Sequence, residues 1–211
     1  MKNNSPVWAA FDFDGTLTQR DSLLPFLRQV LGAGRLAATL TMQAPWLAAY
    51  AVGLLANDRA KARLLRHTLG GMHRSILQEH GKSYATNTLP QLLRPAMMQR
   101  LRQHQAQGHT CVLVTASLTL YTQDWGLTAG LTQVIGSELA YDENGLATGA
   151  LQGKNCYGAE KAVRLRELLP SNAKLYAYGD SRGDLEMLAM ADKAWVINQE
   201  NDYGRKLPEL K

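Results

Sequence analysis

The stretch that decides the fold is Val7–Thr18, with the sequence VWAAFDFDGTLT. Its first part, Val7–Phe13, is mostly apolar, which predicts a short buried strand of the kind found in parallel sheets. The strand runs into Asp12, Asp14 and Gly15, residue types that favour a loop. Since ligands of open α/β sheets bind beyond the carboxyl ends of the strands, these two aspartates mark a candidate site.

The rest of the chain alternates between strand and helix patterns on both sides of a helical block. Strands are predicted at Thr110–Thr115, Lys174–Tyr178 and Ala194–Ile197, and a hairpin at Val134–Ala140 and Leu146–Leu151, around an Asn144-Gly145 turn. Helices are predicted at Ala96–Gln107, Leu118–Leu127, Ala159–Leu169 and Leu185–Met190.

From Asp21 to about Thr88 no strand-like alternation occurs, so several helices are expected there, punctuated weakly at Pro45 and at a few glycines. Asn57 or Asp58 is expected to cap one of them. The predicted fold class is therefore α/β, a Rossmann-like parallel sheet core with an inserted all-helical cap. Residues 1–18 and 90–211 would form the core and residues 19–89 the cap.

Composition narrows the class of protein. The 211 residues are 45% hydrophobic and 19% charged, which argues against disorder. A net charge of +5, without aromatic and basic residues interleaved, excludes nucleic acid as the main partner. Cys111 and Cys156 are expected to be structural, and the five histidines show no zinc spacing. The N-terminus lacks an apolar signal segment, so a cytoplasmic protein is expected.

A second pair of aspartates follows another predicted strand. Asp180 and Asp184 come after Lys174–Tyr178, in the segment GDSRGD. If both loops meet at one edge of the sheet, the carboxylates crowd together, and a divalent cation is the obvious reason to tolerate them. Mg²⁺ fits best, because it prefers oxygen ligands and keeps water ligands that phosphate oxygens can replace.

Groups that bind an anion are expected at the same edge. Thr115 ends a predicted strand, and the small residues Ala116 and Ser117 would expose backbone N–H groups at the start of a helix. Lys161 begins the helix after the hairpin. The chain order is therefore an Asp pair, a hydroxyl, a lysine and a second Asp pair.

This order and the local sequences resemble the haloacid dehalogenase superfamily of phosphohydrolases over nearly the whole chain. The four stretches that resemble the family's motifs are Asp12–Thr18 (DFDGTLT), Val112–Thr115 (VLVT), Lys161, and Gly179–Asp184 (GDSRGD). The helical insertion between the first two is similar to that of the phosphoserine-phosphatase-like branch.

The resemblance implies a mechanism with Asp12 as the nucleophile that forms an aspartyl-phosphate. Asp14 would protonate the leaving oxygen and later activate water. Mg²⁺ would be held by Asp12, the backbone carbonyl of Asp14 and Asp180, with Asp184 behind them. Thr115 and Lys161 would neutralise the phosphoryl oxygens.

Each of these residues also has a simpler interpretation. Asp184 would then cap a helix, Thr115 would be a β-branched strand residue, and Lys161 a solvated lysine. Asp21 lies where phosphoserine phosphatases carry a glutamate that reads the substrate, but it is one methylene shorter and is also suited to cap a helix.

Other functions compete with phosphomonoester hydrolysis. The DxD pattern disfavours a dehalogenase of the same superfamily, which would need neither Asp14 nor the metal site. A non-catalytic phospho-accepting receiver module carries its lysine after all its acids, whereas Lys161 precedes Asp180. A phosphotransferase or phosphomutase stays open, because it shares the aspartyl-phosphate and differs in the acceptor.

Residues 36–57 are without a charged side chain, but only Trp46–Ala56 is strongly apolar, too short to cross a membrane. Buried cap helices are expected here, with a membrane-surface face as the alternative.

The expected substrate is a phosphorylated small molecule or lipid of the phosphoserine, histidinol phosphate or phosphatidylglycerophosphate type. The basic residues from Arg59 to Arg66 would suit an anionic lipid or substrate. The oligomeric state is left open.

Overall fold

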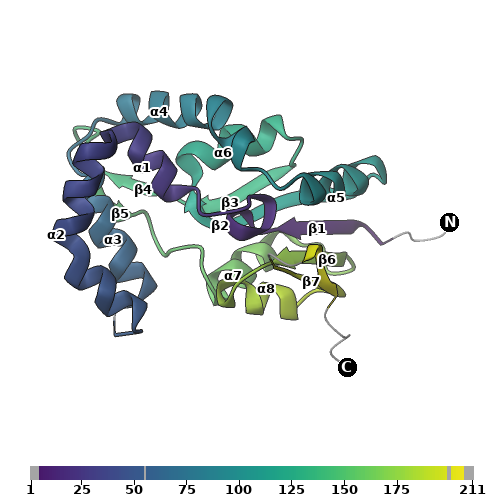
Figure 1. The fold of residues 1–211 in the computed structure, drawn as a ribbon. Coiled ribbons are helices and arrows are strands. Elements are labelled where there is room, and N and C mark those ends of the chain that lie inside the picture. Colours follow the sequence, from purple (N-terminus) through teal and green to yellow (C-terminus); the bar gives the residue numbers. More distant parts are fainter. Residues whose placement is uncertain (1–4, 55, 199–200, 207–211) are drawn as a thin grey trace.

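The structure, a computed structural model, describes residues 5–54, 56–198 and 201–206 (Figure 1). In chain order, with η marking short helical turns, the elements are β1 (Val7–Phe11), η1 (Phe13–Leu17), α1 (Leu23–Leu31), α2 (Ala33–Ala51), α3 (Asn57–Thr68), α4 (Arg74–Asn87), η2 (Leu89–Leu92), α5 (Pro95–Ala106), β2 (Thr110–Leu118), α6 (Thr119–Thr128), β3 (Gln133–Ser137), β4 (Leu139–Tyr141), β5 (Ala147–Leu151), α7 (Ala159–Leu168), β6 (Lys174–Gly179), η3 (Arg182–Asp184), α8 (Leu185–Ala189), β7 (Lys193–Asn198) and β8 (Asn201–Lys206).

The main sheet has the strand order β3-β2-β1-β6-β7-β8. The first five strands run parallel, and β8 joins the edge antiparallel to β7. The predicted α/β class with a Rossmann-like parallel sheet is confirmed, although the sequence analysis did not predict β8. Because β1 lies between β2 and β6, the loops after these three strands open at the same edge of the sheet.

Helices cover both faces of this sheet (Figure 1). On one face, Phe11 of β1 belongs to a buried cluster with Met97 of α5 and Trp125 of α6. On the other, Ala10 packs in a cluster with Leu165 of α7. Neighbouring residues of β1 thus point to opposite cores, which explains why the strand is almost continuously apolar.

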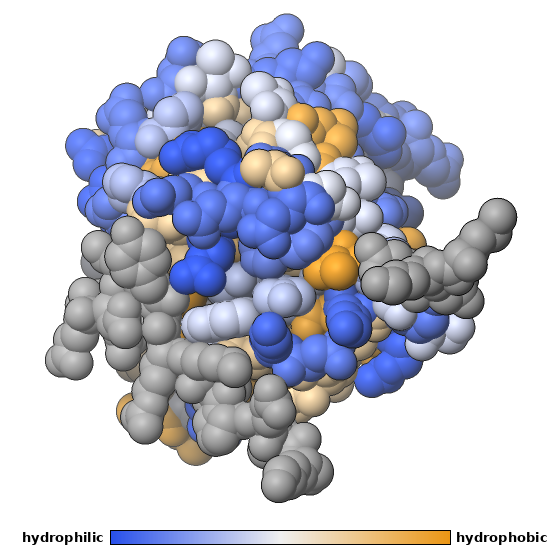
Figure 2. All heavy atoms as spheres, turned by 90° about the vertical axis from the view of Figure 1, so that its right-hand side faces the viewer, coloured by the Kyte–Doolittle hydropathy of each residue, from blue (hydrophilic) through white to orange (hydrophobic). Residues whose placement is uncertain are grey.

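Helices α1–α4 lie between β1 and β2 in the chain and extend beyond the carboxyl end of β1 (Figure 1). Helix α4 packs against α6 of the core, and α3 packs against β5. The β4–β5 hairpin, which the sequence analysis assigned to the core, therefore contacts a helix of the insertion. Figure 2 shows the side of the molecule at the right of Figure 1. Among its coloured atoms most are hydrophilic, and the hydrophobic ones lie in small separate groups.

Three local predictions are wrong. The predicted strand Val134–Ala140 is two strands, because β3 joins the main sheet beside β2 while β4 pairs with β5. Neither Asn57 nor Asp58 caps α3: Ala56 occupies that position without a capping side chain, and the Asn57 amide instead donates to the Tyr50 hydroxyl at 2.9 Å. Pro45 does not end a helix, since α2 continues through it.

Helix α2 also differs from the expected buried helix. Leu36 and Gln43 are buried, but Met42, Trp46 and Tyr50 are exposed. Among the described residues, no helix is long and apolar enough to span a bilayer. Cys111 and Cys156 are both buried, as expected.

A buried histidine of α5, His104, packs against the sheet beside Phe11 and Tyr178. The two ring nitrogens of His104 are 2.7 Å from His109 Nδ1 and 2.8 Å from the Tyr178 hydroxyl. Burial, aided by the nearby His109 and Arg100, lowers the pKa of His104 to about 4.

This pKa predicts a loss of stability in mild acid. Between pH about 6.5 and about 4 the unfolded chain binds a proton at His104 that the folded chain does not, so the free energy of unfolding falls as pH falls. Urea denaturation at several pH values should show a shallower decline for His104→Gln. His67→Gln, at an exposed position of α3, should decline like the wild type. Equal slopes for all three proteins would contradict the assignment.

Candidate active site

The first acidic loop begins where β1 ends. Asp12 follows Phe11, and its backbone N–H donates to the Tyr178 carbonyl of β6 at 2.9 Å. The next residues turn sharply in η1, where Gly15 has a φ of +82°, a conformation that glycine adopts without strain. A Cβ atom at Gly15 would lie 2.2 Å from Asp180 Oδ2, so only glycine lets this backbone approach the second acidic loop.

Lys161, in the first turn of α7, ties the two acidic loops together. Its Nζ lies 2.5 Å from Asp12 Oδ1 and 2.6 Å from Asp184 Oδ1, and all three side chains are buried. Burial alone would lower the pKa of Lys161, but the two facing carboxylates outweigh it and raise the pKa. Lys161 is therefore a buried ammonium ion shared by two carboxylates, not a solvated surface lysine.

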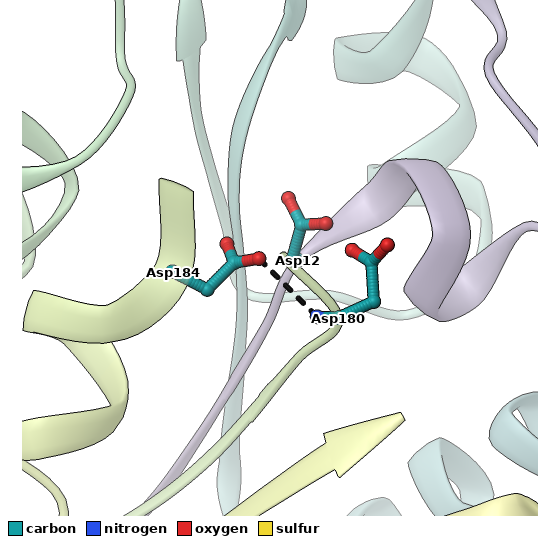
Figure 3. Close-up of side chains that lie close together, drawn as sticks. All are labelled: Asp12, Asp180 and Asp184. Carbon is teal, nitrogen blue, oxygen red and sulfur yellow. Dashed lines mark hydrogen bonds between the residues drawn. The ribbon is translucent and has the colours of Figure 1, made fainter. Parts of the chain in front are cut away.

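The second acidic loop, residues 180–184, is stabilised by hydrogen bonds among its own residues. Asp184 Oδ2 accepts hydrogen bonds from the backbone N–H groups of Asp180 and Ser181, at 3.2 and 3.0 Å, and from the Ser181 hydroxyl at 2.9 Å. Figure 3 shows Asp12, Asp180 and Asp184 around one common space. Asp184 thus stabilises its own loop and also orients Lys161. The simpler interpretation from sequence, in which Asp184 only caps a helix, does not include the contact with Lys161.

The three aspartates form a donor set for a cation. A carboxylate oxygen from each of Asp12, Asp180 and Asp184 lies within 4.8 Å of the other two. Burial, together with the neighbouring carboxylates, raises the pKa of Asp12 and of Asp180. Lys161 supplies one positive charge against three carboxylates. Hard oxygen ligands with excess negative charge fit a divalent cation such as Mg²⁺.

Asp14 points away from this cluster toward the cap. Its Oδ1 accepts a hydrogen bond from the Ser22 N–H at 2.8 Å, and its Oδ2 accepts one from the Ser117 hydroxyl. Burial, and then the nearby charge of Asp21, raises the pKa of Asp14 to about 6. Two aspartates separated by one residue thus have different surroundings, one beside an ammonium ion and one beside hydroxyl and amide groups.

The end of β2 brings the predicted anion-binding residues to the same edge. Thr115 is buried, and its Oγ1 accepts a hydrogen bond from the Ser117 N–H at 2.9 Å. The Ser117 hydroxyl contacts Asp14 and lies 3.3 Å from that of Ser22. The α6 helix begins only at Thr119, two residues later than an N-terminal anion site at Ser117 would require.

Lys61 of α3 is a residue of this edge that the sequence analysis did not single out. Its Nζ donates to the Ala116 carbonyl and to Asn155 Oδ1, the latter at 3.0 Å. Asn155 in turn donates to Asn57 Oδ1 at 2.8 Å. Burial lowers the pKa of Lys61 to about 8. In the sequence Lys61 is one of several basic residues on a helix, and nothing there shows which of them faces the core.

A cavity of about 470 Å³ lies between this edge and the cap helices. Mostly polar residues from the core line one side, namely Asp12, Asp14, Thr115, Ala116, Ser117, Lys161 and Ser181. The cap lines the other side mainly with apolar residues, namely Leu23, Leu24, Leu40, Ala60 and Leu64, together with Tyr50, Asn57 and Lys61. A larger cleft of about 650 Å³ between α4, α6 and β3 contains none of the predicted site residues.

Asp21 lies on the cap side of the cavity, at the start of α1. It lines the cavity, and its Oδ1 accepts a hydrogen bond from the Leu24 N–H at 3.0 Å, which caps α1. The structure therefore brings Asp12, Asp14, Thr115, Lys161, Asp180 and Asp184 together at one edge of the sheet, with Asp21 at the cap side of the cavity.

Comparison with known proteins agrees with this geometry. A sequence profile of the haloacid dehalogenase-like hydrolases matches residues 9–189. The chain belongs to this family. Protein CicA of Caulobacter vibrioides is 36% identical over 90% of this chain and 85% of its own length. The histidinol-phosphatase of Neisseria meningitidis is 24% identical over 95% of this chain and 94% of its own.

The fold is also that of solved phosphatases. A phosphoserine phosphatase, solved as a phospho-aspartyl intermediate analogue, superposes with a TM-score of 0.60 at 16% identity, covering 92% of this chain and 87% of that one. The family resemblance and the fold class predicted from sequence are confirmed, and the protein is one of the haloacid dehalogenase-like hydrolases.

The backbone of this hydrolase at Gly15 provides a test of the loop geometry. Gly15→Ala should reduce phosphatase activity at least about a hundredfold, because the new Cβ would displace Asp180. Gly108→Ala is the matched control: it has a similar φ of +72° but open space around the Cβ position. It should share the backbone strain, about 1–2 kcal/mol, and keep its activity. Equal activity in the two variants would contradict a steric role for Gly15.

Proposed function

We propose that this protein is a Mg²⁺-dependent phosphomonoester hydrolase that acts through an aspartyl-phosphate on Asp12. The observation that carries the proposal is the placement of Asp12 at the core side of the cavity, with Oδ1 bound by Lys161 at 2.5 Å. Lys161 fixes the carboxylate orientation and leaves Oδ2 as the attacking atom.

In the first step Asp12 Oδ2 attacks the phosphorus atom, and the bond from phosphorus to the ester oxygen breaks. Asp14 gives its proton to the departing oxygen, which leaves as an alcohol. A pKa raised to about 6 suits this role, because a measurable fraction of Asp14 is protonated near neutral pH. Thr115 and Lys161 stabilise the negative charge on the phosphoryl oxygens.

In the second step a water molecule attacks phosphorus, and the bond to Asp12 breaks. Asp14, now ionised, accepts the proton of that water. The products are inorganic phosphate and the restored Asp12 carboxylate. The Ser22 N–H and the Ser117 hydroxyl hold Asp14 in one orientation for both proton transfers.

Asp12, Asp180 and the backbone carbonyl of Asp14 would hold Mg²⁺, with Asp184 and Lys161 fixing the ligands from behind. When bound, the cation supplies positive charge that allows a carboxylate to approach a phosphate dianion. Asp180 suits this task, because it is the carboxylate of the three that forms no ion pair with Lys161.

The substrate that the cavity favours is a phosphomonoester with an apolar portion. Phosphoserine, histidinol phosphate and phosphatidylglycerophosphate type esters all offer the phosphate, and relatives of this chain are named for the first two. The leucines on the cap side favour an amphiphilic ester over a small zwitterion. Asp21, close to the mouth, would repel a substrate carboxylate, which further disfavours phosphoserine.

The main experiment measures phosphate release from an aryl phosphate and from the three candidate esters. Activity should need Mg²⁺, disappear with a chelator, and fall at least about a thousandfold in Asp12→Asn, which removes the nucleophile's charge at nearly constant size. Asp124→Asn, at an exposed position on α6, is the control and should keep full activity. Activity retained in Asp12→Asn, or phosphate passed to an added alcohol with no free phosphate formed, would overturn the proposal.

The role of Asp14 predicts a dependence on the leaving group. Asp14→Asn should reduce kcat/KM for an alkyl phosphate at least about tenfold more than for an aryl phosphate, whose leaving oxygen needs no proton. In the wild type the alkyl-to-aryl ratio should fall as pH rises, because Asp14 loses its proton. The midpoint should lie at or below about 6, since a bound cation lowers the pKa. The ratio cancels the ionisation of the phosphate, and equal losses for both esters would contradict this role.

A further inference from the structure

Exposed apolar side chains gather on one side of α2 and on the turn that follows it. Met42, Trp46 and Tyr50 are four residues apart, hence on the same side of the helix, and are 71%, 47% and 41% exposed. In the turn, Val52 and Leu54 are 70% and 82% exposed. These five residues are called the α2 face below. Apolar patches of this kind on a folded protein mark interaction surfaces.

The charged residues that flank this face in the chain have one predominant sign. No charged residue occurs from Leu36 to Asn57, and the neighbouring exposed cations are Arg35, Arg59 and Arg66. The guanidinium of Arg63 lies 4.2 Å over the ring of Trp46. Asp58 is the single acid among these neighbours in the chain. An apolar face flanked by arginines is complementary to a surface that is apolar inside and anionic at its rim.

The α2 face adjoins the mouth of the cavity. Tyr50 belongs to both the face and the lining of the cavity. Leu40 of α2 and Leu24 of α1 also line the cavity, and Leu24 is 43% exposed. In Figure 1, α2 lies at the end of the molecule opposite α5. A flat surface in contact with the α2 face would therefore lie next to the entrance of the site.

We propose that the α2 face docks on an anionic lipid bilayer, with its apolar side chains at the headgroup boundary and the arginines on lipid phosphates. Trp46 and Tyr50 suit this depth, because their rings are apolar with a polar edge. A second copy of the chain is a poorer occupant, since a twofold contact would bring the same arginines face to face. Resting on the proposed function, the docking presents the cavity to amphiphilic phosphomonoesters held in the membrane.

Flotation of the full chain with lipid vesicles tests this docking. The protein should float with phosphatidylcholine vesicles containing about a third phosphatidylglycerol, less with pure phosphatidylcholine, and less at high salt. The Met42→Glu/Leu54→Glu variant should lose at least about tenfold in vesicle partitioning, because two exposed apolar contacts become anionic. Ile76→Glu/Leu127→Glu, at exposed positions of α4 and α6, is the matched control and should float like the wild type.

Hydrolysis of a soluble aryl phosphate without vesicles separates this inference from the proposed function. All three proteins should hydrolyse it equally, since neither variant changes a residue that lines the cavity. A wild type that fails to float, or equal flotation of both variants, would overturn the docking even if the phosphatase activity is confirmed. A dimer that Met42→Glu/Leu54→Glu converts to a monomer, without a change in flotation, would identify a self-interface and also overturn it.

Discussion

The geometry of the site depends on one buried ammonium ion. Lys161 lies between Asp12 on the β1 loop and Asp184 on the β6 loop, at 2.5 and 2.6 Å. Two carboxylates buried this close would repel each other strongly without a positive charge between them. Because Lys161 comes from α7, it also ties that helix to the carboxyl ends of two strands. Removing Lys161 would therefore separate the loops as well as remove a charge, which is why its contribution cannot be divided cleanly into structure and chemistry.

The same contact divides the aspartates into two groups with different chemistry. Asp12 and Asp184 share the ammonium ion, while Asp180 stands beside them without an ion pair to Lys161 and adds to the negative charge that a cation can balance. Asp14 lies within η1, where Ser22 and Ser117 hold it by hydrogen bonds. Two aspartates with different surroundings thus come from one short loop, as the proposed mechanism requires of its nucleophile and its proton donor.

The parts that sequence predicted well are those fixed by the alternation of strands and helices. Buried parallel strands appear in the sequence as apolar runs, so β1, β2 and β6 were predicted, and a shared sheet edge followed for Asp12, Thr115 and Asp180. The end of β2 was placed too early, because the strand continues from Thr115 to Leu118. The contacts of α3 were not predicted, because a lysine that reaches the core, Lys61, has the same spacing as solvated neighbours. The break between β3 and β4 was also missed. Both pieces have strand patterns, and only tertiary pairing assigns them to different sheets.

Helix α2 shows why an apolar sequence alone does not decide burial. Its residues are almost all apolar or small, so no polar stripe marks a solvent side, and the expectation of a buried helix followed from that uniformity. In the fold, its neighbours α1 and α3 cover only part of its surface, leaving Met42 and Trp46 exposed. The side of a helix that faces solvent normally carries charged residues, which keep the protein soluble. Residues 36–57 carry none, and the fold itself does not require their absence. A surface that becomes covered when the site is in use accounts for both the exposed apolar residues and the missing charges.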